Sequence, residues 1–210
     1  MGESFLNIKR NQIEMVKARG YDVEDDLWIL DSDLTFKNFK KKLIKKYGDY
    51  PIRKLMFSEY TKEGSKSLFV FFVGLQEGKQ IKLEAIDPFI HKMVEEDKEG
   101  LLIINSVLSP SALKRLSIIT ESKYQIFQEY EFDFNLINHF MVPKHQLLTT
   151  EEANVLRKKL NFGPKGIPIL PHNDVISQYY NFPVGGIVKI MTENDTDILY
   201  NHTVEYCVVV

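Results

Sequence analysis

The chain has 210 residues, of which 44% are hydrophobic and 27% are charged, and its formal net charge is -2. This composition is typical of a folded globular protein and excludes a disordered chain, which has fewer apolar residues and more charge. A net charge near zero gives no overall attraction to phosphate, so any contact with nucleic acid has to come from a local patch. The single cysteine, Cys207, excludes an internal disulfide and a thiolate cluster for zinc.

The first part of the chain predicts helices that alternate with strands. Apolar residues at helical spacing, glycines at expected helix ends and unbroken apolar runs give this prediction. Thr35 or Asp33 is expected to cap the second helix. The run SLFVFFVGL is typical of a strand that is buried on both faces of a sheet. The expected elements are helices at 5–20, 34–48 and 81–96 and strands at 54–60, 67–75, 101–105 and 123–130.

A further helix is predicted between the last two of these strands. Ser109 can cap it, and Pro110 suits its first position because proline lacks the N–H that would be unpaired there. Leu113, Leu116 and Ile119 are then expected to form its buried stripe.

Two domains are expected. Alternating strands and helices predict an α/β domain with a central mixed sheet in residues 1–132. Residues 133–210 predict a small α+β domain, so the fold class of the chain is α+β. Thr149 and Glu152 in this second domain have the spacing of a capping box. Its expected elements are helices at 150–160 and 174–180 and β segments at 187–191 and 204–210.

The polar residues form no recognisable catalytic or metal-binding pattern. The five histidines lack the spacing of a zinc site, and no Walker A, GxGxxG or GxSxG segment occurs. Glu77-Gly78-Lys79 has the letters of the Glu-x-Lys found in metal-dependent nucleases. The preceding strand, however, offers no carboxylate to share a metal ion. We therefore expect no catalytic residue, no metal and no cofactor, and we keep a metal-dependent nuclease as an alternative.

Six lysines occupy the predicted helix at 34–48. They are a candidate phosphate-contacting patch, which would make the chain a free-standing DNA-binding module. A solvated helix face explains the same residues, since an exposed helix needs polar sides, and this second interpretation is favoured. The lysines are Lys37, Lys40, Lys41, Lys42, Lys45 and Lys46.

Several segments resemble one protein family in their order along the chain. The segment VPKHQLLTTEE at 142–152 is followed by Pro168, Asp174, Tyr179, Gly185 and Val188-Lys189-Ile190. This series resembles the C-terminal module of the fifth subunit of eukaryotic RNA polymerases, a module that archaeal RNA polymerases share. Four upstream segments resemble the N-terminal jaw domain of the eukaryotic subunit: Arg19-Gly20-Tyr21, Leu34-Thr35-Phe36, Val70-Phe71-Phe72 and Pro110-Ser111-Ala112. The resemblance therefore covers nearly the whole chain.

The resemblance implies a fold and a function. The jaw domain would have the fold of restriction endonucleases without their active site. The chain would be a non-catalytic subunit of a multisubunit DNA-dependent RNA polymerase that docks on the largest subunit, contacts neighbouring subunits and lies beside the downstream duplex DNA. The implied partner-interface residues are Pro143, Lys144, His145, Asp174, Tyr179, Gly185 and Lys189. The implied DNA-facing residues, with a weak and sequence-independent contact, are Pro110, Ser111, Ala112 and Lys114.

The chain also departs from the family pattern. Val175, Gln178, Val184 and Thr192 stand where the pattern has arginines or a proline. Loss of arginine removes a bidentate donor that is always charged, so the corresponding contacts are absent or rebuilt with a co-evolved partner. Such divergence suits a viral or otherwise fast-evolving polymerase, for example that of a large DNA virus. The expected location is the nucleus for a cellular protein and the host cytoplasm or virion for a viral one, and no membrane contact is expected.

Overall fold

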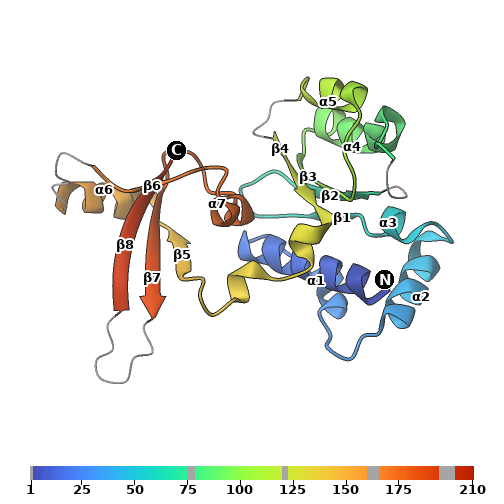
Figure 1. Cartoon of the computed structure of the whole chain (residues 1–210), viewed down its shortest axis with the longest axis horizontal. Helices are drawn as coiled ribbons and strands as arrows, with labels where there is room; N and C mark the ends of the chain where they lie inside the picture. Colours follow the sequence, from blue (N-terminus) through green and yellow to red (C-terminus); the bar gives the residue numbers. More distant parts are fainter. Residues whose placement is uncertain (1, 75–78, 120–122, 160–165, 194–201) are drawn as a thin grey trace. The chain divides into compact units, whose positions relative to one another are not determined.

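The computed structural model describes residues 2–74, 79–119, 123–159, 166–193 and 202–210. The chain divides into two compact units, Met1–Phe134 (unit 1) and Asn135–Val210 (unit 2) (Figure 1). The boundary predicted from the sequence falls after residue 132, where the 3-10 helix η3 (Glu129–Phe132) ends. In the described ranges, no helix has the length and apolar character needed to cross a membrane.

Unit 1 is built on a four-stranded sheet with the strand order β1-β2-β3-β4. β2 is parallel to β3, and β3 is parallel to β4, whereas β1 is antiparallel to β2. The predicted mixed central sheet is thus confirmed. Its strands are β1 (Ser58–Tyr60), β2 (Leu68–Val73), β3 (Glu99–Ile104) and β4 (Tyr124–Gln128).

Helices cover both faces of this sheet (Figure 1). Phe69 and Leu102 share one hydrophobic core with α4 (Leu83–Glu95) and α5 (Pro110–Leu116). Phe72 points to the other face, where the Lys9 ammonium of α1 lies 5.5 Å from the centre of its ring. β2 is consequently buried on both faces, as its apolar run predicts. The other helices of unit 1 are α1 (Gly2–Ala18), η1 (Glu24–Ile29), α2 (Phe36–Tyr47) and α3 (Ile52–Leu55).

Capping residues fix where α2 and α5 begin and end. Thr35 Oγ1 accepts a backbone N–H of the first turn of α2 at 3.4 Å, and Gly48 follows the last turn with a φ of 94°. Ser109 Oγ accepts the N–H of Ala112 at 3.3 Å, and Pro110 is the first residue of α5. These caps are among those that the sequence predicts.

Two local predictions for unit 1 are wrong. The single strand expected at 54–60 is a helical turn, α3, followed by the short β1. Leu55 and Met56 are adjacent and both buried, which a helical turn allows and a strand facing one core does not, because successive strand residues point to opposite faces. In α5, Leu113 is 50% exposed, and Ala112 occupies the buried position instead.

Unit 2 contains a second four-stranded sheet, in the order β5-β7-β8-β6. β7 is antiparallel to both β5 and β8, and β6 runs parallel to β8. β5 and β6 are therefore the two edges of the sheet. The strands are β5 (Lys144–Leu147), β6 (Ile169–Leu170), β7 (Ile187–Glu193) and β8 (His202–Val209).

The helices of unit 2 are α6 (Thr150–Lys159), α7 (Val175–Tyr180) and the 3-10 helix η4 (Leu136–Asn138). The predicted capping box starts α6: the N–H of Thr149 donates to Glu152 Oε2 at 2.8 Å, and the N–H of Glu152 donates to Thr149 Oγ1 at 3.2 Å. The small core of the unit lies between the sheet and α7, and its buried members are Phe182, Val188, Cys207 and Val209. Units 1 and 2 together confirm the predicted α+β class.

Candidate functional site

Among the described strands of unit 2, β5 lies at one edge of the sheet and pairs with β7 alone. The N–H of Leu148, just after β5, donates to the carbonyl of Ile187 at 2.9 Å. Inward and outward backbone groups alternate along an antiparallel strand, so the N–H and C=O groups of His145 and Leu147 point away from β7. An outward row of this kind can pair with an extended segment of another chain.

Two of the predicted interface lysines lie on the same face of this sheet. Lys189 of β7 lies opposite Gln146 of β5, and Lys144 lies opposite Met191. Alternation along the strands places these four side chains on the face that does not carry the core residue Val188. The two ammonium groups are thus diagonal neighbours beside the β5 edge, which favours an acidic partner surface.

The Pro-Lys-His segment before and within β5 has a local structural role. His145 Nδ1 lies 2.7 Å from the carbonyl oxygen of Pro143. Because a carbonyl oxygen only accepts, Nδ1 carries the proton in this contact. The half-buried ring therefore stabilises the bend that leads into the strand.

The other three predicted interface residues lie on or next to α7. Asp174 is the N-cap of α7, and its Oδ1 accepts the N–H of Ile176 at 2.9 Å. The Tyr179 ring is half-buried and meets the Tyr180 ring edge-on, with 5.1 Å between the ring centres. Gly185 has a φ of 84°, and its N–H donates to the carbonyl of Val209 at 2.8 Å. These residues shape unit 2 whether or not they touch a partner.

In unit 1, the predicted DNA-facing residues lie on α5. Pro110, Ser111 and Lys114 are exposed. Ala112 is fully buried in the core next to Leu116, so its side chain faces the sheet. The exposed surface of α5 is therefore formed by Pro110, Ser111 and Lys114 together with Leu113 and Arg115.

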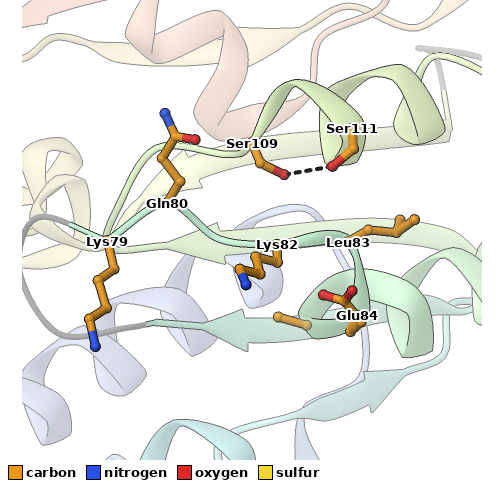
Figure 2. A pocket seen from close by; sticks show the side chains of 8 residues that line it. Lys79, Gln80, Lys82, Leu83, Glu84, Ser109 and Ser111 are labelled. Carbon is orange, nitrogen blue, oxygen red and sulfur yellow. Dashed lines mark hydrogen bonds between the residues drawn. The ribbon is translucent and has the colours of Figure 1, made fainter.

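A cavity of about 730 Å³ opens beside Ser111 (Figure 2). The segments that follow β2 and β3 meet there, because Ile81 and Leu108 form a parallel bridge. The Ser109 and Ser111 hydroxyls are 3.1 Å apart on one side of the cavity. Its lining consists of Lys79, Gln80, Lys82, Leu83, Glu84, Ala85, Ser109 and Ser111.

Two lysines and two hydroxyls outnumber the one carboxylate, Glu84, around this cavity, so the cavity suits an anionic oxygen better than a cation. Lys82 precedes the first turn of α4, whose N–H groups carry no side-chain cap. Lys82 was not identified from the sequence. The available signal is that segments leaving parallel strands converge at the carboxyl edge of a sheet, where ligands commonly bind.

Within the described part of the chain, His, Cys, Asp and Glu side chains do not gather in a group of three or more that could hold a metal ion. Glu77 and Gly78, from the nuclease-like segment Glu77-Gly78-Lys79, lie outside the described residues. Lys79 is exposed at the cavity.

The fold and these surfaces define a two-unit α+β protein whose candidate sites are interfaces. Residues 134–209 match the family described as RNA polymerase Rpb5, C-terminal domain. This match spans almost all of unit 2.

Known relatives match much more of the chain. DNA-directed RNA polymerase V subunit 5A of Arabidopsis thaliana is 28% identical over 87% of this chain and 78% of its own length. DNA-directed RNA polymerases IV and V subunit 5B of the same plant is 28% identical over 95% of this chain and 87% of its own length. Subunit RPABC1 of DNA-directed RNA polymerases I, II, and III from Caenorhabditis elegans is 25% identical over 90% of this chain and 89% of its own length. The predicted family resemblance is confirmed: the chain is similar to fifth subunits of eukaryotic-type DNA-directed RNA polymerases, and residues 134–209 match the model of their C-terminal domain.

Proposed function

We propose that this chain is a non-catalytic assembly subunit of a multisubunit DNA-directed RNA polymerase and acts in transcription. In this proposal unit 2 docks on the largest subunit, and unit 1 lies beside the downstream DNA. The observation that carries it is similarity to polymerase subunits over 87% to 95% of the chain, together with the Rpb5 C-terminal domain in unit 2. We further propose a nuclear location if the polymerase is cellular and a cytoplasmic or virion location if it is viral.

The docking surface in this proposal is the β5 edge of unit 2. An extended segment of the largest subunit would add to the sheet beside β5 through main-chain hydrogen bonds to His145 and Leu147. Acidic side chains of that segment would meet Lys144 and Lys189. The opposite edge is less suitable, since β6 has only two residues and lies between Pro168 and Pro171, which lack N–H groups.

The DNA contact in this proposal is the start of α5 and its neighbouring cavity. Pro110, Ser111 and Lys114 supply an exposed surface, and Lys79 and Lys82 add positive charge beside it. Contacts of this kind bind phosphates and hold a duplex without reading its bases.

A pair of substitutions at one position tests the docking surface. His145→Pro removes the N–H that points away from β7 and leaves the ladder between β5 and β7 intact, whereas His145→Ala keeps that N–H and removes only the ring. Each variant is co-expressed with the tagged largest subunit of the same polymerase, and its recovery is measured. We expect recovery to fall roughly tenfold or more with His145→Pro, and to stay close to the parent with His145→Ala. Equal recovery of both variants would exclude docking through this edge.

The alternative activity, a metal-dependent nuclease, rests only on the letters of Glu77-Gly78-Lys79. Incubation of the purified protein with plasmid DNA and Mg²⁺ or Mn²⁺ separates the two functions. We expect no cleavage. Cleavage by the parent protein that is lost in Glu77→Gln would show that the chain is a nuclease and contradict the proposed function.

A further inference from the structure

The outer face of α2 carries a row of three lysines. Lys37, Lys41 and Lys45 (the α2 lysine row) are exposed, and they lie opposite the buried residues Phe39 and Leu43. Residues four apart on a helix are separated by about 6 Å along its axis, so the row presents evenly spaced positive charges over two turns. This is a strong local charge in a chain whose net charge is -2.

Several surface lysines elsewhere in unit 1 are ion-paired. Within the described ranges, lysines outside α2 form the lysine ion pairs of unit 1, and none of these pairs involves the α2 lysine row. Lys66 and Lys123 both bind Asp97, at 2.5 and 2.7 Å. Lys92 binds Glu96 at 2.7 Å. Among the described residues, nearby carboxylates neutralise these lysines, whereas the α2 lysine row keeps its charge for a partner from outside.

The row does not serve the stability of α2. Lysines at i and i+4 repel each other, which applies to Lys37 with Lys41 and to Lys41 with Lys45. Lys37 also lies in the first turn, where the helix dipole disfavours a cation, and that turn contains no acidic residue. Only Lys45, in the last turn, is placed favourably. A merely solvated face would be served as well by mixed charges.

We propose that the α2 lysine row binds the phosphodiester backbone of nucleic acid, as a contact separate from the start of α5. Lysine ammonium groups bind phosphate as point charges and need no fixed geometry. The row lacks the exposed aromatic and aliphatic anchors that usually dominate a protein interface. Lys41 and Lys45 of the row line one groove of about 360 Å³ together with Asp31 and Asp33. The phosphates are therefore expected on the side of the row that faces away from these carboxylates. The inference does not depend on docking of unit 2.

Salt-dependent binding of the full chain tests this inference. The probes are a fluorescent DNA duplex of random sequence and a single-stranded RNA, measured by anisotropy between about 50 and 200 mM KCl. The variant is Lys37→Gln/Lys41→Gln/Lys45→Gln. The matched control, Lys66→Gln/Lys92→Gln/Lys123→Gln, removes the same charge from lysines that are ion-paired. Circular dichroism checks that both variants keep the fold.

We expect the α2 variant to lose roughly tenfold or more in affinity at low salt, and its slope of log affinity against log salt to fall by about 0.9 for each duplex phosphate that the variant no longer binds. The control should keep the parent slope. Weaker binding of duplex DNA, of RNA or of both supports the inference and identifies the polymer. An equal effect of variant and control would overturn it, as would binding of polyglutamate with no binding of either nucleic acid.

A third variant separates this contact from the one proposed at α5. Lys79→Gln/Lys82→Gln/Lys114→Gln removes charge only around the cavity. If this variant alone weakens binding, the α2 inference is wrong and the proposed DNA contact stands. If only the α2 variant weakens binding, the α2 inference stands and the proposed contact at α5 is wrong. Independent losses in both variants support both contacts.

Discussion

The Lys9 ammonium lies 3.6 Å from the Asp26 carboxylate inside unit 1, and the two side chains are 2% and 13% exposed. The ammonium also donates to Gln12 Oε1 at 2.7 Å and to Ser58 Oγ at 2.8 Å. Burial lowers the pKa of Lys9 to about 8, although the nearby Asp26 opposes the shift. Burial alone would raise the pKa of Asp26, but Lys9 and two hydroxyl donors outweigh it, and that pKa is lowered. The pair therefore belongs to a hydrogen-bonded part of the core of unit 1.

Breaking this pair should destabilise unit 1 more than replacing both partners. Asp26→Asn leaves the Lys9 charge buried without a counter-charge, and we expect it to cost about 3–5 kcal/mol. Lys9→Met/Asp26→Asn leaves no buried charge, so its loss should be smaller. Urea unfolding followed by the fluorescence of Trp28, the single tryptophan, reports on unit 1 alone. If the double variant loses as much free energy of unfolding as Asp26→Asn, or more, the two charges do not stabilise each other and the prediction is wrong.

The lowered pKa of Lys9 gives unit 1 a pH dependence of known sign. The pKa of Lys9 is about 8 in the folded state, and the unfolded chain has the ordinary lysine value of 10.5. Between pH 8 and 10.5 the unfolded chain therefore binds more protons than the folded one. Stability therefore rises with pH in this window, by about 2 kcal/mol between pH 8 and 9.5. Above pH 10 the raised pKa of Tyr60 acts in the opposite sense, because the unfolded tyrosine loses its proton first. The rise in the urea midpoint should be absent in Lys9→Met, and a parallel rise in that variant would assign it to other groups.

Gly186 should be required for the position of β5. A Cβ at this residue would lie 2.9 Å from Leu147 Cδ1 and 2.9 Å from the Pro183 carbonyl oxygen. We expect Gly186→Ala to destabilise unit 2 by about 1–3 kcal/mol and to speed amide hydrogen exchange in β5 and β7. Gly185→Ala is the comparison: its Cβ meets nothing within 4 Å, and only its φ of 84° is unfavourable, at about 1–2 kcal/mol. Faster exchange in β5 for Gly185→Ala than for Gly186→Ala would contradict the steric explanation.

A negative charge in the cavity of Figure 2 should weaken DNA binding. Ser111→Glu places a carboxylate on the lining of the cavity and near the start of α5, where it would repel phosphate. We expect a loss of roughly threefold to tenfold in duplex affinity at low salt, equivalent to about 0.7–1.4 kcal/mol. Ser117→Glu, at the exposed C-terminal end of α5, adds the same charge away from the cavity. The same loss in both variants would show that net charge, and not this surface, controls binding.

Local signals in the sequence predicted most of the elements correctly. Thr35, Ser109 and the pair Thr149 and Glu152 cap helices as expected, because a cap needs only residues within one turn. The unbroken apolar run of β2 likewise predicted its burial. β5 and β6 were both missed, because strands of four and two residues show little periodicity and their pairing with β7 and β8 depends on residues far along the chain.

The candidate sites were less predictable than the fold. The Lys9–Asp26 pair joins α1 to η1, and the cavity of Figure 2 joins the segments after β2 and β3, so no short window of sequence contains either one. Pro143, Lys144 and His145 were singled out by family resemblance. The structure adds that His145 contacts Pro143 and that β5 is an edge strand of the described sheet.

Affinity purification of the tagged full chain from its native source tests the central claim most directly. We predict that the largest subunit of a DNA-directed RNA polymerase and its neighbouring subunits are recovered in equimolar amounts with the chain, and that His145→Pro lowers their recovery whereas His145→Ala does not. Full recovery of the tagged chain without any polymerase subunit would contradict its role as a polymerase subunit.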